Sequence, residues 1–448
     1  MRTIQTQVCV LGAGMGGIGC AYRLVQKGIK TVVIDRNPDF GGTAVFSGVD
    51  GFEPGVTLDG LHQQIREELS KIENGAHVVE VVPNLNLFEP DTGLDWSKHS
   101  FTEHPWGLSV GVDLPYEATL GRCAFLQKDG PMCRYQFEPD AMRKAIGEIF
   151  KPYQKKMTTL FESRFISCEK EGHKIKSVTV STPEGENRIF ADTFVDASGD
   201  IVLARATGCE VAFGTDRKRY QEPSDDGMDR LNGVSYVFRI QKMPDVDYVD
   251  EIPEERRSPE CSGWKNREEE RVISCFVLYP NGDINVNMLP TMEGKEYFEL
   301  GEKADAVGHA RVYQYWHYLQ QEKNMQGYTL KKIYQAGIRE GYRLVGRHVL
   351  TEQEVRAGIL AQPKTGRCVA IADHALDVHG EGGMCRELEY PYEIPIECCM
   401  AKEFDNLFVA CRGASFSHIA ASSARLNRTM LSMGEGVGEY IAEQIQGM

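Results

Sequence analysis

An acid and an imidazole stand two residues apart at Asp377 and His379, within the segment "ALDVHG". If this segment is extended, both side chains lie on the same face, and the carboxylate can fix the tautomer of the histidine. A histidine held in this way is a base that can remove an alcohol proton while a hydride leaves the substrate. A surface pair without a chemical role explains the same two residues equally well.

Arginines recur at every fourth position, at Arg339, Arg343 and Arg347. On a helix this spacing would align the three cations on one face. There they could bind a carboxylate or a phosphate in a bidentate manner. Salt bridges to the many surface acids are an equally good explanation, so the pattern leaves both open.

The stretch "VLGAGMGGIGCAYRLVQKGIKTVVIDR" at residues 10–36 could bind phosphate through its backbone. Its apolar pattern predicts a buried strand, then a helix that stops at Gly28, then a second strand of the parallel type. In such a unit Gly12 forms the tight turn, Gly14 lets the backbone approach a pyrophosphate, and Gly17 lets the helix pack on the strand. The helix N-terminus then faces the phosphates.

Asp35 lies 23 residues after Gly12, at the end of the second predicted strand. This spacing is typical of the acid that binds a ribose hydroxyl in a dinucleotide site. A glycine-rich turn without a ligand is the alternative. Two further segments favour the dinucleotide site: Gly41 and Gly42 begin a second loop that exposes backbone, and a distant predicted strand ends in "VDASGD" at 195–200.

Together these segments resemble the FAD-dependent oxidoreductase family with the glutathione-reductase-type FAD fold. The resemblance is carried by "GAGMGG", "IDR", "GGT", "VDASGD", "GIREGYRLVGRHVLTEQEV" at 337–355, "ALDVHG", and "YEIPIECCMAKEFDNLFVACRGASFSHIAASSARL" near the C-terminus. Residues 44–135 and 215–330 match weakly. The resemblance implies an α/β fold: a Rossmann-like FAD-binding domain with a parallel sheet, assembled from discontinuous segments, plus an inserted α+β substrate lobe. The expected bounds are 1–60, 137–215 and 335–448 for the FAD-binding domain, and 61–136 and 216–334 for the substrate or cap lobe.

The resemblance also implies which residues bind FAD, without a covalent bond, and which contact the substrate. The expected FAD-binding residues are Gly12, Gly14, Met15, Gly16, Gly17, Asp35, Arg36, Gly41, Gly42, Thr43, Arg164, Ala197, Ser198, Gly199 and Arg412. Cys411 stands in "VACRG" where the family usually has a glycine. A histidine and an arginine recur in the family at the positions of His418 and Arg425, so these two join His379 as candidate catalytic residues. His418 alone is also explained as a helix cap or a packing residue.

The C-terminal region ends in a predicted long helix. Its apolar stripe consists of Ile419, Leu426, Met430, Met433, Val437 and Ile441. Before it, "SFSHIAASSA" supplies serine caps and small residues that a flat ring can approach. The positive end of the helix dipole would offset negative charge on a reduced flavin. A simple packing helix is the alternative.

The predicted function is hydride transfer between FAD N5 and a small polar organic substrate: the hydroxyl group of a sugar or an acid, or an activated carbon–carbon double bond. No second GxGxxG follows a strand between 150 and 300, so a separate NAD(P)H domain is not expected, and the electron donor or acceptor is not identified. A flavin-dependent monooxygenase and a non-catalytic FAD-bound redox sensor or scaffold are the alternatives.

Composition narrows the class of protein. The chain has 448 residues, of which 42% are hydrophobic, and a net charge of −15, which disfavours nucleic-acid binding. No apolar run is long enough for a membrane span, and the N-terminus lacks a signal-peptide pattern. The thirteen cysteines include no CxxC, so neither a metal site nor a disulfide framework is expected, and a cytoplasmic location fits. The sequence is compatible with a homo-oligomer.

The remaining pattern predicts elements with little chemistry. A helix is expected at 137–150, strands with turns at Gly172 and Gly185 follow it, and helical periodicity covers about 296–324. Cys398 and Cys399 are expected as buried thiols in a strand. The acidic stretch at 241–271 is expected to be a solvated excursion of the substrate lobe.

Overall fold

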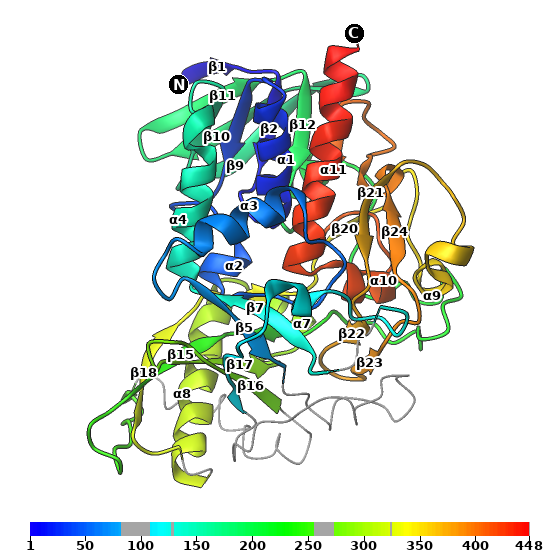
Figure 1. Cartoon of the computed structure of the whole chain (residues 1–448). Helices are drawn as coiled ribbons and strands as arrows, with labels where there is room; N and C mark the ends of the chain where they lie inside the picture. Colours follow the sequence, from blue (N-terminus) through cyan, green and yellow to red (C-terminus); the bar gives the residue numbers. More distant parts are fainter. Residues whose placement is uncertain (82–107, 127–129, 255–272, 323–324, 448) are drawn as a thin grey trace.

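The computed structural model describes residues 1–81, 108–126, 130–254, 273–322 and 325–447. Its central layer is a five-stranded parallel sheet (Figure 1). In order across the sheet the strands are β25 (Leu407–Val409), β12 (Thr193–Asp196), β2 (Val8–Leu11), β3 (Thr31–Ile34) and β8 (Met157–Leu160). These strands come from distant parts of the chain, which confirms the predicted α/β fold with a parallel sheet built from discontinuous segments.

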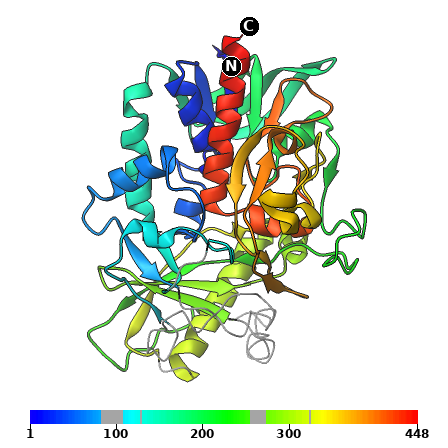
Figure 2. The same ribbon diagram turned by 45° about the vertical axis from the view of Figure 1, so that its right-hand side comes forward.

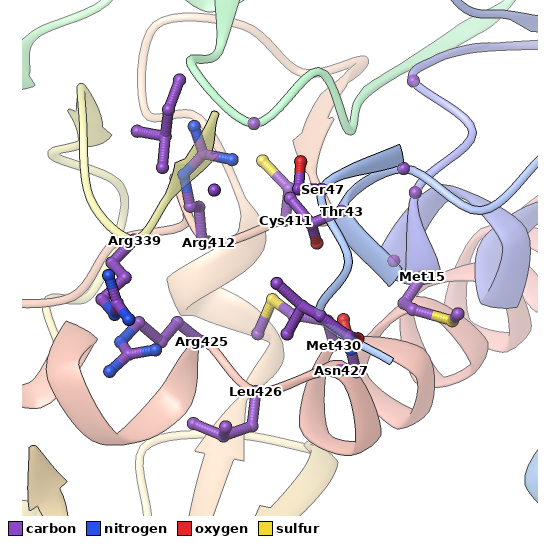
Figure 3. Close-up of a pocket in the computed structure, with 18 of the residues that line it drawn as sticks. Met15, Thr43, Ser47, Arg339, Cys411, Arg412, Arg425, Leu426, Asn427 and Met430 are labelled. Carbon is purple, nitrogen blue, oxygen red and sulfur yellow. Dashed lines mark hydrogen bonds between the residues drawn. The ribbon is translucent and has the colours of Figure 1, made fainter. Parts of the chain in front are cut away.

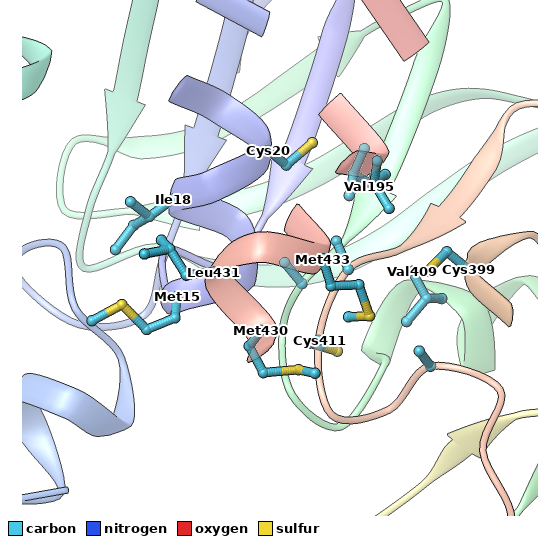
Figure 4. Close-up of a cluster of buried hydrophobic side chains, with 14 of the residues drawn as sticks. Met15, Ile18, Cys20, Val195, Cys399, Val409, Cys411, Met430, Leu431 and Met433 are labelled. Atoms are coloured by element: carbon cyan, nitrogen blue, oxygen red, sulfur yellow. The ribbon is translucent and has the colours of Figure 1, made fainter. Parts of the chain in front are cut away.

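Helix α1 (Met15–Gln26) connects β2 to β3 and packs along α11 (Asn427–Gln446). Glycines on both helices allow this close approach, because a Cβ at Gly434 or Gly19 would overlap backbone oxygen of the opposite helix. Apolar side chains, Met15 and Met430 among them, fill the space beneath the two helices (Figure 4). The first and last segments of the chain therefore form one core.

A second sheet flanks the parallel one, in the order β1 (Arg2–Gln5), β11 (Gly185–Phe190), β10 (Lys174–Thr182) and β9 (Arg164–Glu171). Gly172 and Gly185 both have positive φ at its turns, as predicted. Helix α4 (Pro139–Phe150) begins after the N-cap Glu138, with Pro139 in its first turn, which confirms the helix predicted at 137–150.

The second lobe has its own core and an α+β architecture. Its sheet runs β18 (Tyr328–Ile333), β15 (Phe238–Lys242), β17 (Ile284–Leu289), β16 (Ile273–Leu278) and β6 (Leu108–Ser109). The predicted helical region divides into α7 (Gly294–Leu300) and α8 (Ala304–Glu322), and Val312, Tyr315, Trp316 and Leu319 of α8 are buried in this core. In both views α8 lies at the opposite end of the molecule from the two termini (Figures 1 and 2).

Shorter elements complete the described part of the chain. They are α2 (Thr43–Phe46), β4 (Gly51–Phe52), α3 (Gly60–Leu69), β5 (Ala76–Glu80), β7 (Cys133–Phe137), α5 (Val202–Thr207), β13 (Val211–Ala212), β14 (Val234–Ser235), β19 (Gly337–Ile338), β20 (Arg343–Leu344), α9 (Glu352–Ala361), β21 (Cys368–Ala372), β22 (Leu376–Val378), β23 (Met384–Arg386), β24 (Tyr392–Pro395) and α10 (His418–Ala424). None of the described helices combines the length and apolar character of a membrane span.

The predicted domain bounds stay a prediction. The packing of α3 indicates to which lobe one part of the predicted cap segment belongs. Its residues Leu61, Ile65 and Leu69 are buried in the core of the parallel-sheet lobe, and Glu435 of α11 accepts a hydrogen bond from the backbone N–H of Leu61. We therefore propose that α3 belongs with the first lobe, although all of it after Gly60 lies within the predicted cap segment 61–136. Within the acidic stretch, residues 255–271 lie outside the described residues.

Three predictions of local structure are wrong. The last helix is not continuous from Ile419, because Leu426 has extended backbone (φ −70°, ψ 149°) and separates α10 from α11. Residues 337–347 form β19 and β20 rather than a helix, so the regular arginine spacing there does not mark one face. Cys398 and Cys399 are buried as expected, but they lie in a 3₁₀ turn and not in a strand.

Candidate active site

A cavity of about 620 Å³ opens where β2, β3 and β12 end, and residues of both lobes line it. The carboxyl ends of parallel strands are the usual ligand site of such sheets, and the volume is typical of small-molecule sites. The first lobe contributes its glycine loops, and the second contributes residues around Ser235, Cys275 and Asn287. Figure 3 shows one part of this cavity, with arginines on one side and Met15, Thr43 and Asn427 on the other.

The loop before α1 leaves a space that fits a phosphate. A Cβ built on Gly14 would meet only the Cα of Gly42, at 3.8 Å, so this position is open toward the cavity. No side chain in the described part of the chain caps the N-terminus of α1, where helical N–H groups lack intrahelical partners. The backbone and the helix dipole there would attract an anion.

A second loop packs directly on the first. Gly42 has φ +52°, and a Cβ on it would lie 2.6 Å from the Cα of Gly14. The N–H of Gly41 donates to the carbonyl of Ala13 at 2.9 Å, which ties the two loops together. Only glycine satisfies both the positive φ and the close approach at position 42.

Asp35 both holds the loop and lines the cavity. Its Oδ2 accepts from the N–H of Ala13 at 2.6 Å, and its Oδ1 accepts from the N–H of Asn37 at 2.8 Å. Burial raises the pKa of Asp35, although these backbone hydrogen bonds oppose the rise. Each carboxylate oxygen keeps a further lone pair, so a ribose hydroxyl can still donate to it.

Most of the predicted site residues line this cavity. They are Gly12, Gly14, Met15, Gly16, Asp35, Arg36, Gly42, Thr43, Arg164, Ala197, Ser198, Gly199, Arg412, His379 and Arg425. Gly17, Gly41 and His418 do not line it. Gly17 acts through packing, since a Cβ there would overlap the carbonyl oxygen of Gly12.

The acid–imidazole pair is formed as the extended segment predicts. Asp377 lies in β22, and its Oδ2 is 2.7 Å from Nε2 of His379. Because an ionised carboxylate only accepts hydrogen bonds, Nε2 is the protonated nitrogen and Nδ1 carries the lone pair. Arg425 donates through Nη2 to the carbonyl and to Oδ2 of Asp377, both at 3.2 Å.

Burial and charge set the ionisation of this pair. Burial disfavours the carboxylate of Asp377, but the imidazolium that His379 forms at low pH and the cation Arg425 outweigh the effect of burial, and the pKa of Asp377 is well below its usual range. Burial lowers the pKa of His379 to about 4 against the attraction of Asp377, and the cations Arg339 and Arg425 lower it further. His379 is therefore neutral near pH 7.

Arg412 and Cys411 follow β25 and line the cavity beside Gly199. Arg412 donates from Nη2 to Oδ1 of Asp200 at 2.9 Å, and a Cβ on Gly199 would overlap its guanidinium. Burial raises the pKa of the Cys411 thiol to about 12, so this thiol is neutral. The cysteine that replaces the expected glycine thus adds no charge to the site.

The break between α10 and α11 changes which helix end meets the cavity. Leu426, Asn427 and Met430 line it, whereas Ser417 caps α10 by accepting from the N–H of Ala420 at 3.0 Å. In the described residues no side chain caps α11, and Asn427 donates to the carbonyl of Val49 at 2.8 Å. The helix N-terminus available to a bound ring is therefore that of α11, nine residues after His418.

His418 is buried away from the cavity. Its Nδ1 lies 2.9 Å from Oε2 of Glu340, and that carboxylate also accepts from the backbone and side-chain N–H groups of Asn232. The Oδ1 of Asn232 in turn accepts from the N–H of His379 at 2.9 Å. A chain of hydrogen bonds thus connects His418 to the backbone of His379.

Several polar residues that line the cavity were not predicted from the sequence. They include the ionisable residues Glu53, Arg122, Arg134 and His374, of which the first three lie within residues 44–135, a segment that matches the family weakly. No local signal marks them, because their partners are far apart in the chain: Arg122 pairs with Glu387, and Arg134 with Glu53.

A buried acid, Glu222, which accepts from the N–H of Glu352 at 2.6 Å, makes the stability of the fold depend on pH. Burial raises the pKa of Glu222 from 4.5 to about 7. The folded chain therefore holds this proton more tightly than the unfolded chain, and the stability that Glu222 contributes at acidic pH is lost as the pH rises from about 4.5 to 7. We expect Glu222→Gln to reduce the loss of unfolding free energy between pH 5 and pH 8 by about 1–3 kcal/mol.

Urea unfolding at both pH values measures this difference, and Glu184→Gln, at an exposed turn, is the matched control. An unchanged pH dependence in Glu222→Gln would show that Glu222 is not protonated in the folded chain.

Comparison with known proteins adds four findings. A family model described as FAD dependent oxidoreductase matches residues 7–447. The thiamine thiazole synthase of Sulfolobus acidocaldarius is 31% identical over 83 residues, which are 18% of this chain and 31% of that protein. The 4-oxocyclohex-2-ene-1-carboxylate 5-dehydrogenase of Sinomonas cyclohexanicum is 27% identical over 140 residues, 29% of this chain and 23% of that protein. These alignments therefore span less than a third of either relative.

A geranylgeranyl bacteriochlorophyll reductase-like protein from Thermoplasma acidophilum is a similar solved structure. It aligns over 99% of this chain and 80% of its own, at 11% identity and a TM-score of 0.45.

Proposed function

The chain belongs to the FAD-dependent oxidoreductase family, and from this premise we propose that it transfers a hydride between FAD and a small polar organic substrate. The substrate carries a hydroxyl group, as in a sugar or an acid, or an activated carbon–carbon double bond. The observation that carries this proposal is that the neutral His379, held by Asp377, shares one cavity with the glycine loops.

FAD, when bound, supplies the group that accepts or returns the hydride. The residues that would hold it are those of the two glycine loops, Asp35, and the segment around Gly199 and Arg412. The open position at Gly14 and the uncapped N-terminus of α1 suit a pyrophosphate, and the carboxylate of Asp35 suits a ribose. The uncapped N-terminus of α11 provides positive potential at the other end of the cavity.

His379 is the proposed acid–base group. With Nε2–H donated to Asp377, the lone pair on Nδ1 can take the proton of a substrate hydroxyl, and Asp377 stabilises the imidazolium that results. In the reverse direction Nδ1 returns this proton. Arg425 holds Asp377 in place by donating to its carbonyl and carboxylate.

We propose that His418 is a positioning residue. It acts through Glu340 and Asn232, whose Oδ1 holds the N–H of His379. The carbonyl of His379 also accepts from the N–H of Gly233 at 2.9 Å, so two adjacent residues of the second lobe hold both sides of this backbone.

The pH dependence of the proposed reaction follows from the pKa of His379 near 4. The neutral base is the active form, so the rate of hydride removal from an alcohol is expected to be level from about pH 5 to 8 and to fall tenfold per unit below about pH 4. The rate of hydride removal is measured at each pH by following the reduction of the bound flavin in a stopped-flow instrument. A rate that still rises with pH through 7 would point to a base other than His379.

The function itself is tested by mixing the FAD-loaded protein, without oxygen, with panels of hydroxy acids, sugars and unsaturated acids. Loss of the visible absorbance of oxidised flavin, with formation of the matching ketone or aldehyde, supports the proposal for an alcohol. For a substrate with an activated double bond, the flavin is first reduced. Return of its visible absorbance when the unsaturated compound is added supports the proposal. Reduction by NAD(P)H alone, followed by oxygen insertion into a substrate, would contradict it and favour a monooxygenase.

A further inference from the structure

Arg339 is half-buried and differs from the other buried or half-buried arginines of the cavity because it has no carboxylate partner in the described chain. Four lining arginines each pair with an acid: Arg122 with Glu387, Arg134 with Glu53, Arg412 with Asp200, and Arg425 with Asp377. Two others, Arg36 and Arg164, are exposed. Among the residues that the structure describes, Arg339 donates only from Nη1, to the carbonyl of Gly233 at 2.9 Å and to Oγ of Ser235 at 2.8 Å.

The surroundings of Arg339 leave positive charge uncompensated. Burial lowers its pKa to about 9, and repulsion from Arg425 adds to this effect, so the two cations act on each other (Figure 3). Asp377 is the carboxylate that acts on Arg339, and Arg425 shares it while also being attracted by Glu340 and Glu53. A cation that is largely removed from water and has no hydrogen-bonded carboxylate is unfavourable, and an entering anion would relieve that cost.

The free donors of Arg339 suit a carboxylate. Its Nε and Nη2 make no hydrogen bond to any described residue, and this edge of a guanidinium binds both oxygens of a carboxylate in parallel. The Nε of Arg425 is buried and has no partner in the described chain. The neutral acceptors Gly233 and Ser235 hold Arg339 in place without cancelling its charge.

We propose that Arg339, assisted by Arg425, binds a carboxylate group of the substrate, which makes the substrate class small hydroxy acids or sugar acids rather than neutral alcohols. This inference rests on the proposed function, because it narrows the substrate of the same site. Asn232 to Ser235 connect the two parts: Asn232 fixes the backbone of His379, and Ser235 fixes Arg339. One segment thus sets the distance between the base and the anion-binding cation.

The test measures binding of acetate to the FAD-loaded protein, by the change in the visible flavin spectrum and by calorimetry at constant ionic strength. Acetate is expected to bind, and the neutral acetamide is not. Arg339→Gln should weaken acetate binding by about 10- to 100-fold, because a charge-assisted fork is lost. Arg339→Lys should retain part of the affinity, and Arg367→Gln, at an exposed pair with Glu443, should retain all of it.

Three results would overturn the proposal. Equal affinity for acetate in Arg339→Gln and the native protein would show that Arg339 does not bind the carboxylate. Equal affinity for acetate and acetamide would show that negative charge on the ligand does not contribute to binding. Loss of FAD from both Arg339 variants, or a changed flavin reduction potential with unchanged acetate affinity, would assign Arg339 to the cofactor instead.

The same samples separate this inference from the proposed function. If acetate binds as expected but no hydroxy acid or sugar acid exchanges a hydride with the flavin, the anion site stands and the function fails. If neutral sugars reduce the flavin as fast as sugar acids in both the native protein and Arg339→Gln, the function stands and the anion site fails.

Discussion

Gly14→Val is expected to yield a folded protein that retains little FAD. A Cβ at this position meets no protein atom closer than 3.8 Å, so a side chain can begin here without overlapping the backbone. It projects instead into the cavity between the two glycine loops, where a pyrophosphate would lie. Overpacking of this kind costs about 1–3 kcal/mol, which corresponds to roughly 10- to 100-fold weaker binding.

The choice of glycine matters for this experiment. A Cβ on Gly16 would overlap the carbonyl oxygen of Ala410, so substitution there would disturb the packing of α1 on the core and confuse loss of fold with loss of ligand. Gly147→Val is the matched control, because a Cβ at Gly147 in α4 meets nothing within 4 Å and lies far from the loops in sequence.

FAD content per protein chain and the thermal unfolding midpoint are measured on all three proteins. We expect Gly147→Val to resemble the native protein in FAD content. A Gly14→Val sample that elutes yellow, with one FAD per chain, would show that the pyrophosphate does not pass between these loops.

The glycine loops could be predicted from the sequence because each demands a local property of the backbone. Gly42 needs positive φ and close approach, and at Gly14 the absence of a side chain leaves the space that a pyrophosphate would need. Such demands leave a readable pattern at a fixed spacing. The extended Asp377 and His379 pair could be predicted for the same reason, since side chains two residues apart in a strand share a face.

The end of the site that would bind substrate could not be predicted in this way. Arg339 takes its role from Gly233 and Ser235, more than a hundred positions earlier in the chain, and its spacing to Arg343 suggested a helix that is not there. Arg343 is instead buried in an ion pair with Glu340 and Asp216. The partner of a buried charge is set by the tertiary fold, which local periodicity does not encode.

The helix break before α11 escaped prediction because the apolar stripe runs through it. Leu426 continues the helical spacing, yet its backbone is extended, and the uncapped end of α11 meets the cavity there. Adjacent to it, Arg425 leaves the last turn of α10 to reach Asp377. The break therefore places a cation and a helix N-terminus at the same end of the site, which one continuous helix would not do.

The second large effect is expected for His379→Gln. Glutamine can still hydrogen-bond to Asp377 but cannot accept a proton, so the reduction of bound flavin by a reactive alcohol should slow by about 10²- to 10⁴-fold. FAD content should stay unchanged, because His379 contacts neither glycine loop in the hydrogen-bond network of the described residues. His173→Gln, at an exposed turn, is the matched control.

Comparison with His418→Gln separates the base from the residue that positions it. His418 is buried outside the cavity and reaches His379 only through Glu340 and Asn232, so its loss should slow flavin reduction less and leave the level pH profile above pH 5 intact. Substitution of His379 removes the titrating group itself, so the residual rate should no longer fall below pH 4. If His418→Gln instead abolishes the fall in rate below pH 4 while His379→Gln preserves it, His418 carries the proton. His379 would then serve only to bind the substrate.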